Sequence, residues 1–259
     1  MAAKYRIPVI CQKPMSETFK SCLRMYKACK DAGIPFFIHE NYRYRSKYQQ
    51  FKSLLKENIV GKIRRAEIFV GSAGRIAFSR QPYLKKFTSY ILEDSGTHIF
   101  DLMRYFFGEP QSIYTNTIQT YHDIPTENYM ASLIKYKDMI CSVLVGEKGA
   151  TAIFVDGEDG TLELKLDGRI FIETKGKSEI RKIPKFSRYK WDRHIRDYYP
   201  DDLIPAIIEC NRSFKESFIT GESPPTDAAD NLKTMEIIFA ARESVEKNIA
   251  VELKFGRKL

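Results

Sequence analysis

The sequence predicts a mixed fold of the α/β and α+β classes: a short βαβ unit followed by a large, mostly antiparallel sheet with helices packed on one face. Three observations predict it. The first forty residues alternate strand, helix and strand patterns, closely spaced period-two segments follow from Lys62, and two amphipathic helices come near the end. The 259 residues suffice for one large domain or two small ones.

The βαβ unit comes first. Residues 7–11 form a short apolar run that stops before Pro14, and Ser16 is a candidate N-cap for the helix that follows. In that helix apolar residues recur at i, i+3, i+4 and i+7, and Gly33 is placed to end it. A second apolar run, 34–38, completes the unit and predicts a parallel pair of strands. Two strands cannot form such a sheet alone, so we expect the end of a larger α/β domain.

The antiparallel sheet is expected after a helix around residues 44–58. Alternation of apolar and polar residues begins at Lys62, and Asp167-Gly168 lies between two alternating runs, which predicts a tight hairpin. Strands so close in sequence are typical of antiparallel pairing. Further strands are expected at 112–119, 129–136, 140–147, 151–155, 162–166, 170–173 and 179–183. The last elements are expected at 202–220, after Thr226-Asp227, and at 251–253.

Composition excludes several classes of protein. Apolar residues make up 43% and charged residues 29%, as in ordinary globular proteins and unlike disordered or collagen-like chains. We expect no membrane span, because no uncharged apolar run reaches the length one needs. The five cysteines predict reduced thiols and a cytoplasmic protein, and their spacing, with four scattered histidines, predicts no metal site.

The sharpest candidate for chemistry is the pair Asp94 and His98, at the start of an amphipathic segment that Gly108 ends. On an α-helix, residues four apart lie on one face, and a carboxylate beside an imidazole can orient it for acid–base catalysis. The simpler interpretation is that Asp94 is an N-cap and His98 a structural histidine. From spacing alone we favour this simpler interpretation, because capping carboxylates are common.

Two other candidates directly follow the predicted parallel strands. They are Gln12-Lys13-Pro14 and the segment 39–45, which includes Asn41, Tyr42 and Arg43. Ligands of parallel α/β sheets bind beyond the carboxyl ends of strands, so these groups are placed to meet a hydroxyl or anionic ligand. The alternatives are a surface lysine in a turn, which by itself is the simpler account, and a solvated helix start.

A basic and aromatic segment, 185–199, is the last candidate. Arginines, lysines and aromatic residues interleaved in this way can stack on bases and neutralise phosphates. We prefer a loop with aromatic anchors packed over the sheet, because no nucleic-acid-binding motif accompanies the segment. The net charge of +9 permits anionic partners without identifying them.

Four stretches, in order, resemble the Gfo/Idh/MocA family of NAD(P)-dependent oxidoreductases, which includes glucose–fructose oxidoreductase and inositol dehydrogenase. The resemblance covers nearly the whole chain. The stretches are VICQKPMSETFKSCLRMYKACKDAG, like the family's strand, E-K-P motif and helix; NYRYRSKYQQFKSLLKENIVGKIRRAEI, like its arginine-containing segment; LEDSGTHIFDLMRYFFGEP, like its helix start with the spacing D-x-G-x-H; and PDDLIPAIIECNRSFKESFITGESPPTDAADNLKTMEIIFAARESVEKN, like its C-terminal helical pair.

The resemblance implies a fold, a reaction and a set of residues. It implies the end of a Rossmann domain over residues 1–41 and a substrate-binding and oligomerisation domain over 42–259. It implies hydride transfer between NAD or NADP and a secondary alcohol of a sugar or cyclitol. The family's catalytic trio corresponds to Lys13, Asp94 and His98, in which His98 is the base, Lys13 stabilises charge on the substrate oxygen and Asp94 positions both. Gln12, Lys13 and Pro14 would lie at the cofactor. Asn41, Tyr42 and Arg43 would lie near the substrate.

Two departures from the family accompany the match. Gln12 stands where the family usually has Glu, so Lys13 lacks that charge partner. No G-x-G-x-x-G motif occurs, and we expect a family member to carry roughly a hundred more residues before Lys4. The first alternative is therefore an inactive, truncated paralogue or an assembly subunit without nucleotide binding. The second is a basic nucleic-acid-binding module, which we rank last. A homo-oligomer through the open sheet face is the expected assembly.

Overall fold

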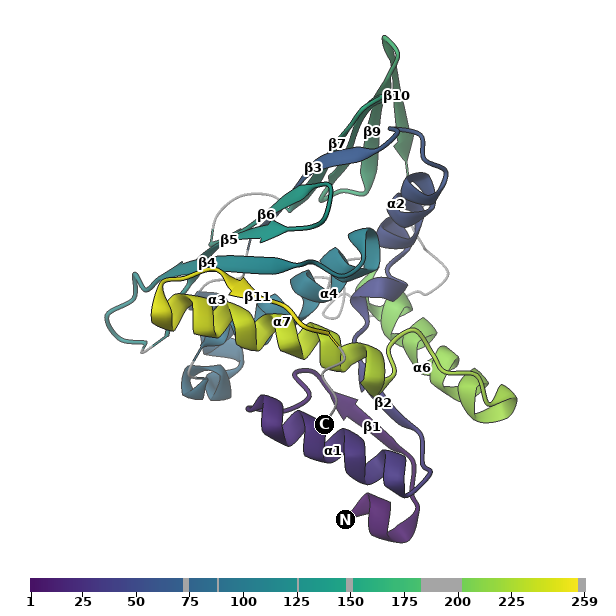
Figure 1. The fold of residues 1–259 in the computed structure, drawn as a ribbon, viewed down its shortest axis with the longest axis vertical. Coiled ribbons are helices and arrows are strands. Elements are labelled where there is room, and N and C mark those ends of the chain that lie inside the picture. The colour runs from purple at the N-terminus through teal and green to yellow at the C-terminus, as the bar shows by residue number, and fades with distance from the viewer. Residues whose placement is uncertain (72–74, 88, 125, 148–150, 183–201, 256–259) are drawn as a thin grey trace.

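The computed structural model describes the chain except residues 72–74, 88, 125, 148–150, 183–201 and 256–259. A two-stranded parallel sheet near the N-terminus lies below a nine-stranded sheet, and helices fill the space between them (Figure 1). In the described part of the chain, no helix is long and apolar enough to cross a bilayer. The thiols of all five cysteines are free, as their number predicted.

The N-terminal βαβ unit forms as predicted. Strands β1 (Val9–Gln12) and β2 (Phe36–His39) pair in parallel, and α1 (Phe19–Asp31) connects them. The prediction that Ser16 caps α1 is wrong. The side chain of Thr18 accepts the hydrogen bond from the Ser21 N–H, because a capping side chain must come directly before the first helical residue.

The large sheet contains all the strands that alternation predicted. Its order is β10-β9-β8-β7-β3-β6-β5-β4-β11, and every pair is antiparallel except β3 with β6. The strands are β3 (Ile63–Gly71), β4 (Ser112–Ile118), β5 (Tyr129–Lys135), β6 (Ile140–Gly146), β7 (Ala152–Gly157), β8 (Gly160–Lys165), β9 (Arg169–Thr174), β10 (Lys177–Lys182) and β11 (Val251–Glu252). The hairpin between β8 and β9 turns at Gly168, whose φ of 84° favours glycine.

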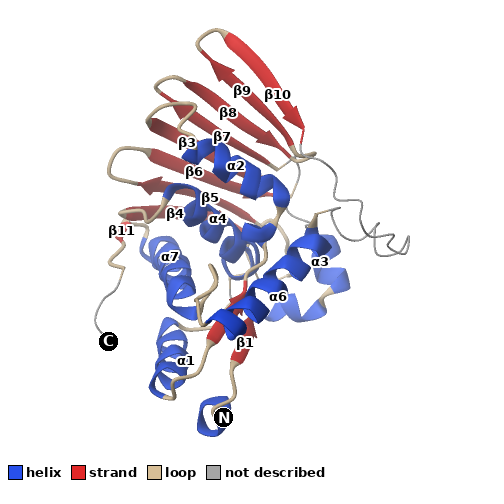
Figure 2. Cartoon of the chain, turned by 90° about the vertical axis from the view of Figure 1, so that its right-hand side faces the viewer, coloured by secondary structure: helices blue, strands red, loops and turns tan. Residues whose placement is uncertain are grey.

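The two faces of this sheet differ in burial. Helices α2 (Ser46–Lys56), α4 (Thr97–Phe107) and α7 (Ala228–Lys247) lie along one face, where alternate residues of the strands are buried (Figure 2). The residues between them point to the other face, and Leu133 and Ile140 are half exposed there. The alternation in sequence therefore reports a sheet with one covered face, as predicted.

Several helical segments lack a counterpart in the sequence-based prediction. They are α3 (Arg75–Arg80), three short 3₁₀ segments, η1 (Ala2–Tyr5), η2 (Tyr42–Tyr44) and η3 (Pro82–Lys86), and a π-helical turn η4 (Ile91–Gly96) that continues directly into α4. Because η4 continues into α4, the helix that carries His98 begins earlier than the spacing suggested.

The C-terminal helices hold the βαβ unit against the rest of the chain. Helix α6 (Leu203–Thr220) packs on β2, where the ring of Phe37 stacks on Phe214 at 5.1 Å. The chain leading into α7 adds a hydrogen bond from the Ile38 N–H to the Thr226 carbonyl. Helix α7 starts directly after Thr226-Asp227, as predicted, and the side chain of Asp227 caps it. The carboxyl ends of β1 and β2 are thereby fixed beside the start of α4.

Candidate functional site

The candidate site lies where the carboxyl ends of β1 and β2 meet the helix formed by η4 and α4. Lys13 directly follows β1, and Glu40 directly follows β2. Asp94 belongs to η4, and His98 to the first turn of α4. Lys13 thus contacts Asp94, which lies 81 positions later in the sequence. Glu40 contacts His98 in the same way.

Lys13 is bound to Asp94 through two hydrogen bonds. Its Nζ atom donates to Oδ1 of Asp94 at 2.7 Å and to the Asp94 carbonyl oxygen at 3.0 Å. An ammonium has three donors, so one N–H is left for another acceptor. The side chains are 17% and 31% exposed, which leaves the pair accessible to a ligand.

His98 is bound to Glu40. The Nδ1 atom of His98 lies 2.7 and 2.8 Å from the two carboxylate oxygens of Glu40, which is fully buried. The carboxylate also accepts the backbone N–H of Tyr42 at 3.0 Å. Burial lowers the pKa of His98 below its usual value, although the charge of Glu40 acts in the opposite direction. A neutral imidazole follows, with Nδ1–H donating to Glu40 and Nε2 left as an acceptor.

The ring of Tyr42 fixes the plane of this imidazole. The two rings are stacked, with centroids 3.9 Å apart and planes 4° from parallel. The guanidinium of Arg45 lies 4.5 Å from the centroid of the Tyr42 ring. Contact with Tyr42 and the bond to Glu40 together leave the imidazole little freedom to rotate.

The structure differs from the sequence-based interpretations of Asp94. Asp94 is not an N-cap, because it lies inside the helical turn Ile91–Gly96. Its carboxylate binds Lys13, and the carboxylate that binds the imidazole is Glu40. The physical reason is the π turn: its wider winding offsets residues four apart, which would lie directly above one another on a regular α-helix.

The other predicted residues have distinct environments. The side-chain oxygen of Gln12 accepts the N–H of Lys13 at 3.1 Å, and Pro14 follows in the same turn. The Oδ1 atom of Asn41 is buried and has no hydrogen-bond partner among the described residues. Tyr42 contacts His98, whereas the guanidinium of Arg43 is buried away from it against Asp101.

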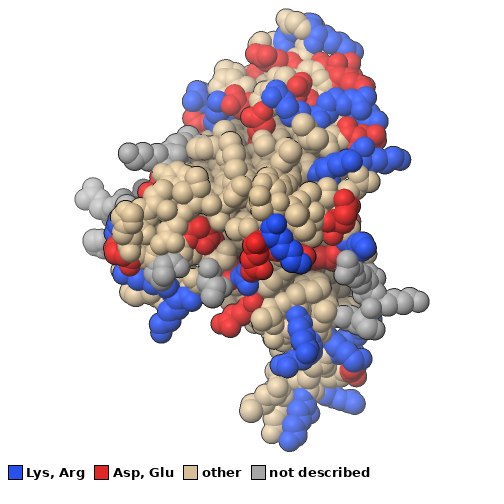
Figure 3. Space-filling view, turned by 60° about the vertical axis from the view of Figure 1, so that its left-hand side comes forward, with Lys and Arg blue, Asp and Glu red and all other residues tan. Residues whose placement is uncertain are grey.

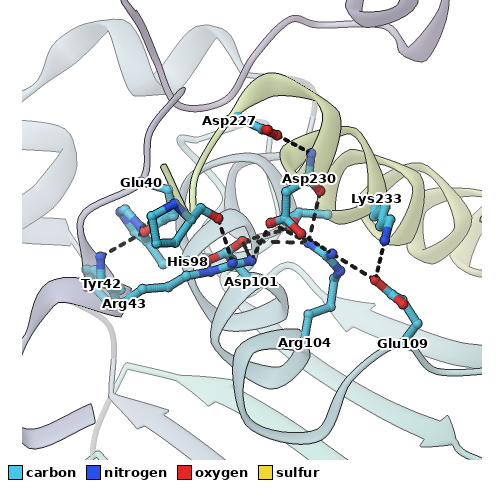
Figure 4. A network of polar contacts seen from close by, with 12 residues as sticks. Glu40, Tyr42, Arg43, His98, Asp101, Arg104, Glu109, Asp227, Asp230 and Lys233 are labelled. Atoms are coloured by element: carbon cyan, nitrogen blue, oxygen red, sulfur yellow. Dashed lines mark hydrogen bonds and ion pairs between the residues drawn. The ribbon is translucent and has the colours of Figure 1, made fainter. Parts of the chain in front are cut away.

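Arg43 belongs to a network of ion pairs in which Arg43, Asp101 and Arg104 are buried (Figure 4). It donates to both carboxylate oxygens of Asp101 at 2.6 Å, and its Nη2 lies 2.8 Å from Asp230. Arg104 also binds Asp230, and both Arg104 and Lys233 bind Glu109. Because Asp101 and Arg104 lie on α4 and Asp230 on α7, the network fixes the rotation of the helix that carries His98.

Glu40 is the functional residue that sequence reasoning missed. It lies in the segment 39–45, which its position after a parallel strand had already marked. The available signal was that β1 and β2 are neighbours, so that a carboxylate just after β2 must lie close to the lysine just after β1. Among the described residues, no group of three metal-binding side chains occurs. The basic segment 185–199 lies outside the described residues.

Comparison with known proteins identifies a domain family and several relatives. Residues 48–163 match the model of the GFO/IDH/MocA C-terminal domain. The chain is similar to D-apiose dehydrogenase of Paraburkholderia graminis, with 28% identity over 98% of this chain and 68% of the relative. It is also similar to myo-inositol 2-dehydrogenase of Thermotoga maritima, with 23% identity over 97% of this chain and 74% of the relative.

The chain is also similar to a solved structure. The crystal structure of an oxidoreductase from Agrobacterium radiobacter, in complex with NAD+, L-tartaric acid and magnesium, superposes with a TM-score of 0.86. The two sequences are 25% identical, and the match covers 97% of this chain and 75% of that one. Residues 48–163 therefore match the C-terminal domain of the Gfo/Idh/MocA family, and the chain as a whole is similar in sequence and fold to oxidoreductases.

Proposed function

We propose that this protein is an NAD(P)-dependent dehydrogenase that oxidises a secondary alcohol of a sugar or cyclitol. The observation that carries the proposal is the His98 imidazole, whose Nδ1 contacts the buried carboxylate of Glu40, beside the accessible Lys13–Asp94 pair. The relatives support the substrate class, since they include dehydrogenases of D-apiose and myo-inositol.

His98 is the general base in this proposal. Its Nδ1 is occupied by Glu40, so Nε2 takes the proton of the substrate hydroxyl as the C–O bond becomes a carbonyl. A base must be unprotonated to work, and burial, which lowers the pKa of His98, keeps it so near neutral pH. In the reverse direction the same atom returns the proton to the carbonyl oxygen.

Lys13 stabilises the substrate oxygen. Two of its donors bind Asp94, and the remaining N–H can donate to the oxygen while negative charge develops on it. Asp94 keeps the ammonium in place. In the proposal Asn41 and Tyr42 border the substrate, and the Oδ1 atom of Asn41 has no hydrogen-bond partner among the described residues.

The residues present fit the reacting end of a nicotinamide cofactor. A proton acceptor and an ammonium lie together at the carboxyl ends of parallel strands, where dinucleotides bind in doubly wound sheets. When bound, the nicotinamide supplies the acceptor for the hydride. Gln12, Lys13 and Pro14 would border it. The turn from Lys13 to Thr18 contains no glycine, so we do not assign the pyrophosphate to this turn.

We further propose two units and an assembly. Residues 1–41 would contribute the end of the nucleotide-binding domain, and 42–259 the substrate domain. The uncovered face of the large sheet would bind a second copy of the chain. Leu133 on β5 and Leu144 on β6 are exposed on that face, and Figure 3 shows a broad surface with few charged side chains in its middle.

The direct test is reduction of NAD+ or NADP+ by a panel of aldoses, inositols and their acids. We expect turnover of at least one polyol by the wild-type protein and a loss of about a hundredfold or more in kcat for Lys13→Met and His98→Gln. His122→Gln is the matched control, because His122 is exposed and outside the site. Absence of both turnover and nucleotide binding would instead support an inactive paralogue.

A further inference from the structure

We propose that Glu40 is the positioning residue of His98: it fixes the tautomer with Nδ1 protonated and stabilises the imidazolium that forms when Nε2 takes the substrate proton. The inference deepens the proposed function and rests on it for the identity of the proton donor. The tautomer and charge of His98, however, are properties of the protein itself and can be measured without substrate.

The contacts of Glu40 favour this role over a purely structural one. Glu40 is fully buried, and the structure pairs it with a histidine and one backbone N–H rather than with a full cation in direct contact. Burying a carboxylate costs several kcal/mol unless a charge compensates for it. The charge of Glu40 is therefore best compensated when His98 becomes an imidazolium.

The geometry also excludes Asp94 as the orienting carboxylate. Asp94 is tied to Lys13 at 2.7 Å, and its side chain is 31% exposed. Glu40 lies 2.7 Å from Nδ1 with its side chain 1% exposed, so water screens its charge far less. Figure 4 shows Glu40 beside His98 at the edge of the buried network that fixes α4.

The charged groups around His98 come from the segments that follow β1 and β2 and from η4. Glu40 follows β2, Lys13 follows β1, Asp94 belongs to η4, and Arg45 lies behind the stacked ring of Tyr42 that follows β2. Lys13 lowers the pKa of His98, and Glu40 and Asp94 raise it. Glu40 has the largest raising effect, so removing its charge must lower the pKa of His98 further.

The first arm of the test uses the protein without substrate. Imidazole nitrogen shifts of His98 are followed by NMR against pH in wild type and in Glu40→Gln, which keeps the side-chain volume. We expect Nδ1–H in wild type, a mixture of tautomers in Glu40→Gln, and a lower pKa in the variant. Glu163→Gln is the matched control, because Glu163 binds Lys165 on β8 and lies outside the site and the ion-pair network of α4. An unchanged tautomer and pKa in Glu40→Gln would overturn the proposal.

The second arm measures kcat/KM against pH. Protonated His98 is inactive as a base, so the acidic limb should move to lower pH in Glu40→Gln, and kcat should fall at least about tenfold. Glu40→Asp keeps the charge on a shorter side chain, so its His98 pKa should lie between those of wild type and Glu40→Gln. If Glu40→Gln does not fold, an unchanged His98 pKa and tautomer in Glu40→Asp would overturn the proposal.

The two arms separate this inference from the proposed function. A shift of the His98 pKa without turnover of any polyol by wild type would support Glu40 and reject the dehydrogenase. Turnover by wild type with identical pH profiles in wild type and Glu40→Gln would support the dehydrogenase and reject the role of Glu40.

Discussion

At the scale of the residue, His98 shows how burial and a partner charge act against each other. Burial favours the neutral ring, and Glu40 favours the charged one. Since the pKa of the folded form is below the ordinary value of 6.5, the unfolded chain binds the proton more tightly. The same feature that prepares a base therefore makes the fold sensitive to acid.

This predicts how stability depends on pH. The contribution of His98 is fully present above its unfolded pKa, about 6.5, and is lost as the pH falls toward the folded pKa. Urea unfolding of wild type should show a falling free energy between about pH 7 and pH 5. In His98→Gln this part of the slope should disappear. Equal slopes in the two proteins would show that His98 does not titrate as the structure implies.

The sequence identifies these residues unevenly, for a physical reason. Lys13, Asp94 and His98 are brought together only by the resemblance to the family, since spacing alone favours an N-cap, a structural histidine and a surface lysine. The partner of each side chain depends on helix winding and on which strands are neighbours. That is why Asp94 was assigned to His98 and Glu40 was missed.

At the scale of the element, α4 is the part that must be held in register. Its buried face carries Asp101 and Arg104, whose bonds to Arg43 and Asp230 connect the segment after β2 with α7. A rotation of α4 would turn His98 away from Glu40. The ion pairs thus act on the site through the helix.

Removing a buried ion pair of this network should lower the free energy of unfolding much more than removing a surface ion pair. Arg43→Met leaves the buried carboxylate of Asp101 without its bidentate partner, and we expect a loss of about 3–5 kcal/mol in unfolding free energy. The matched variant Arg65→Met removes a pair with Glu67 in which both side chains are about half exposed, and should cost less than about 1 kcal/mol. Denaturant titration of both variants measures the difference. Similar losses would contradict the assignment.

The elements themselves were predictable where one period dominates. The strands of the sheet and helices α1, α6 and α7 agree with their sequence patterns, since each buries one face. The π turn η4 was not predicted, because no residue preference marks an i→i+5 turn inside an otherwise helical pattern. Helix α3 is six residues long, too short for a period to be recognised.

At the scale of the whole molecule, the two faces of the large sheet differ in their surroundings. Its covered face supports the helices that carry the site, and its open face exposes Leu133, Ile140 and Leu144. In register, Ala131 pairs with Leu144, and Leu133 with Ser142, so these side chains share one face. A charge placed there should disturb assembly and leave the site intact.

We therefore predict that Leu133→Glu lowers the oligomeric state in sedimentation experiments while the Tm changes little. Ile219→Glu is the matched control, because Ile219 is exposed on α6 and away from the sheet. If both variants sediment like wild type, the open face is not the interface. A loss of assembly in Ile219→Glu alone would assign the interface to α6.

The central claim is that Nε2 of His98 takes the substrate proton, and the pH profile of kcat/KM for nicotinamide reduction tests it most directly. Wild type should lose activity on the acidic side with a slope of one proton, near the NMR-measured pKa of His98. His98→Gln should lose about a hundredfold or more in rate and show no such limb. A His98→Gln protein that keeps both the rate and the acidic limb would contradict the account.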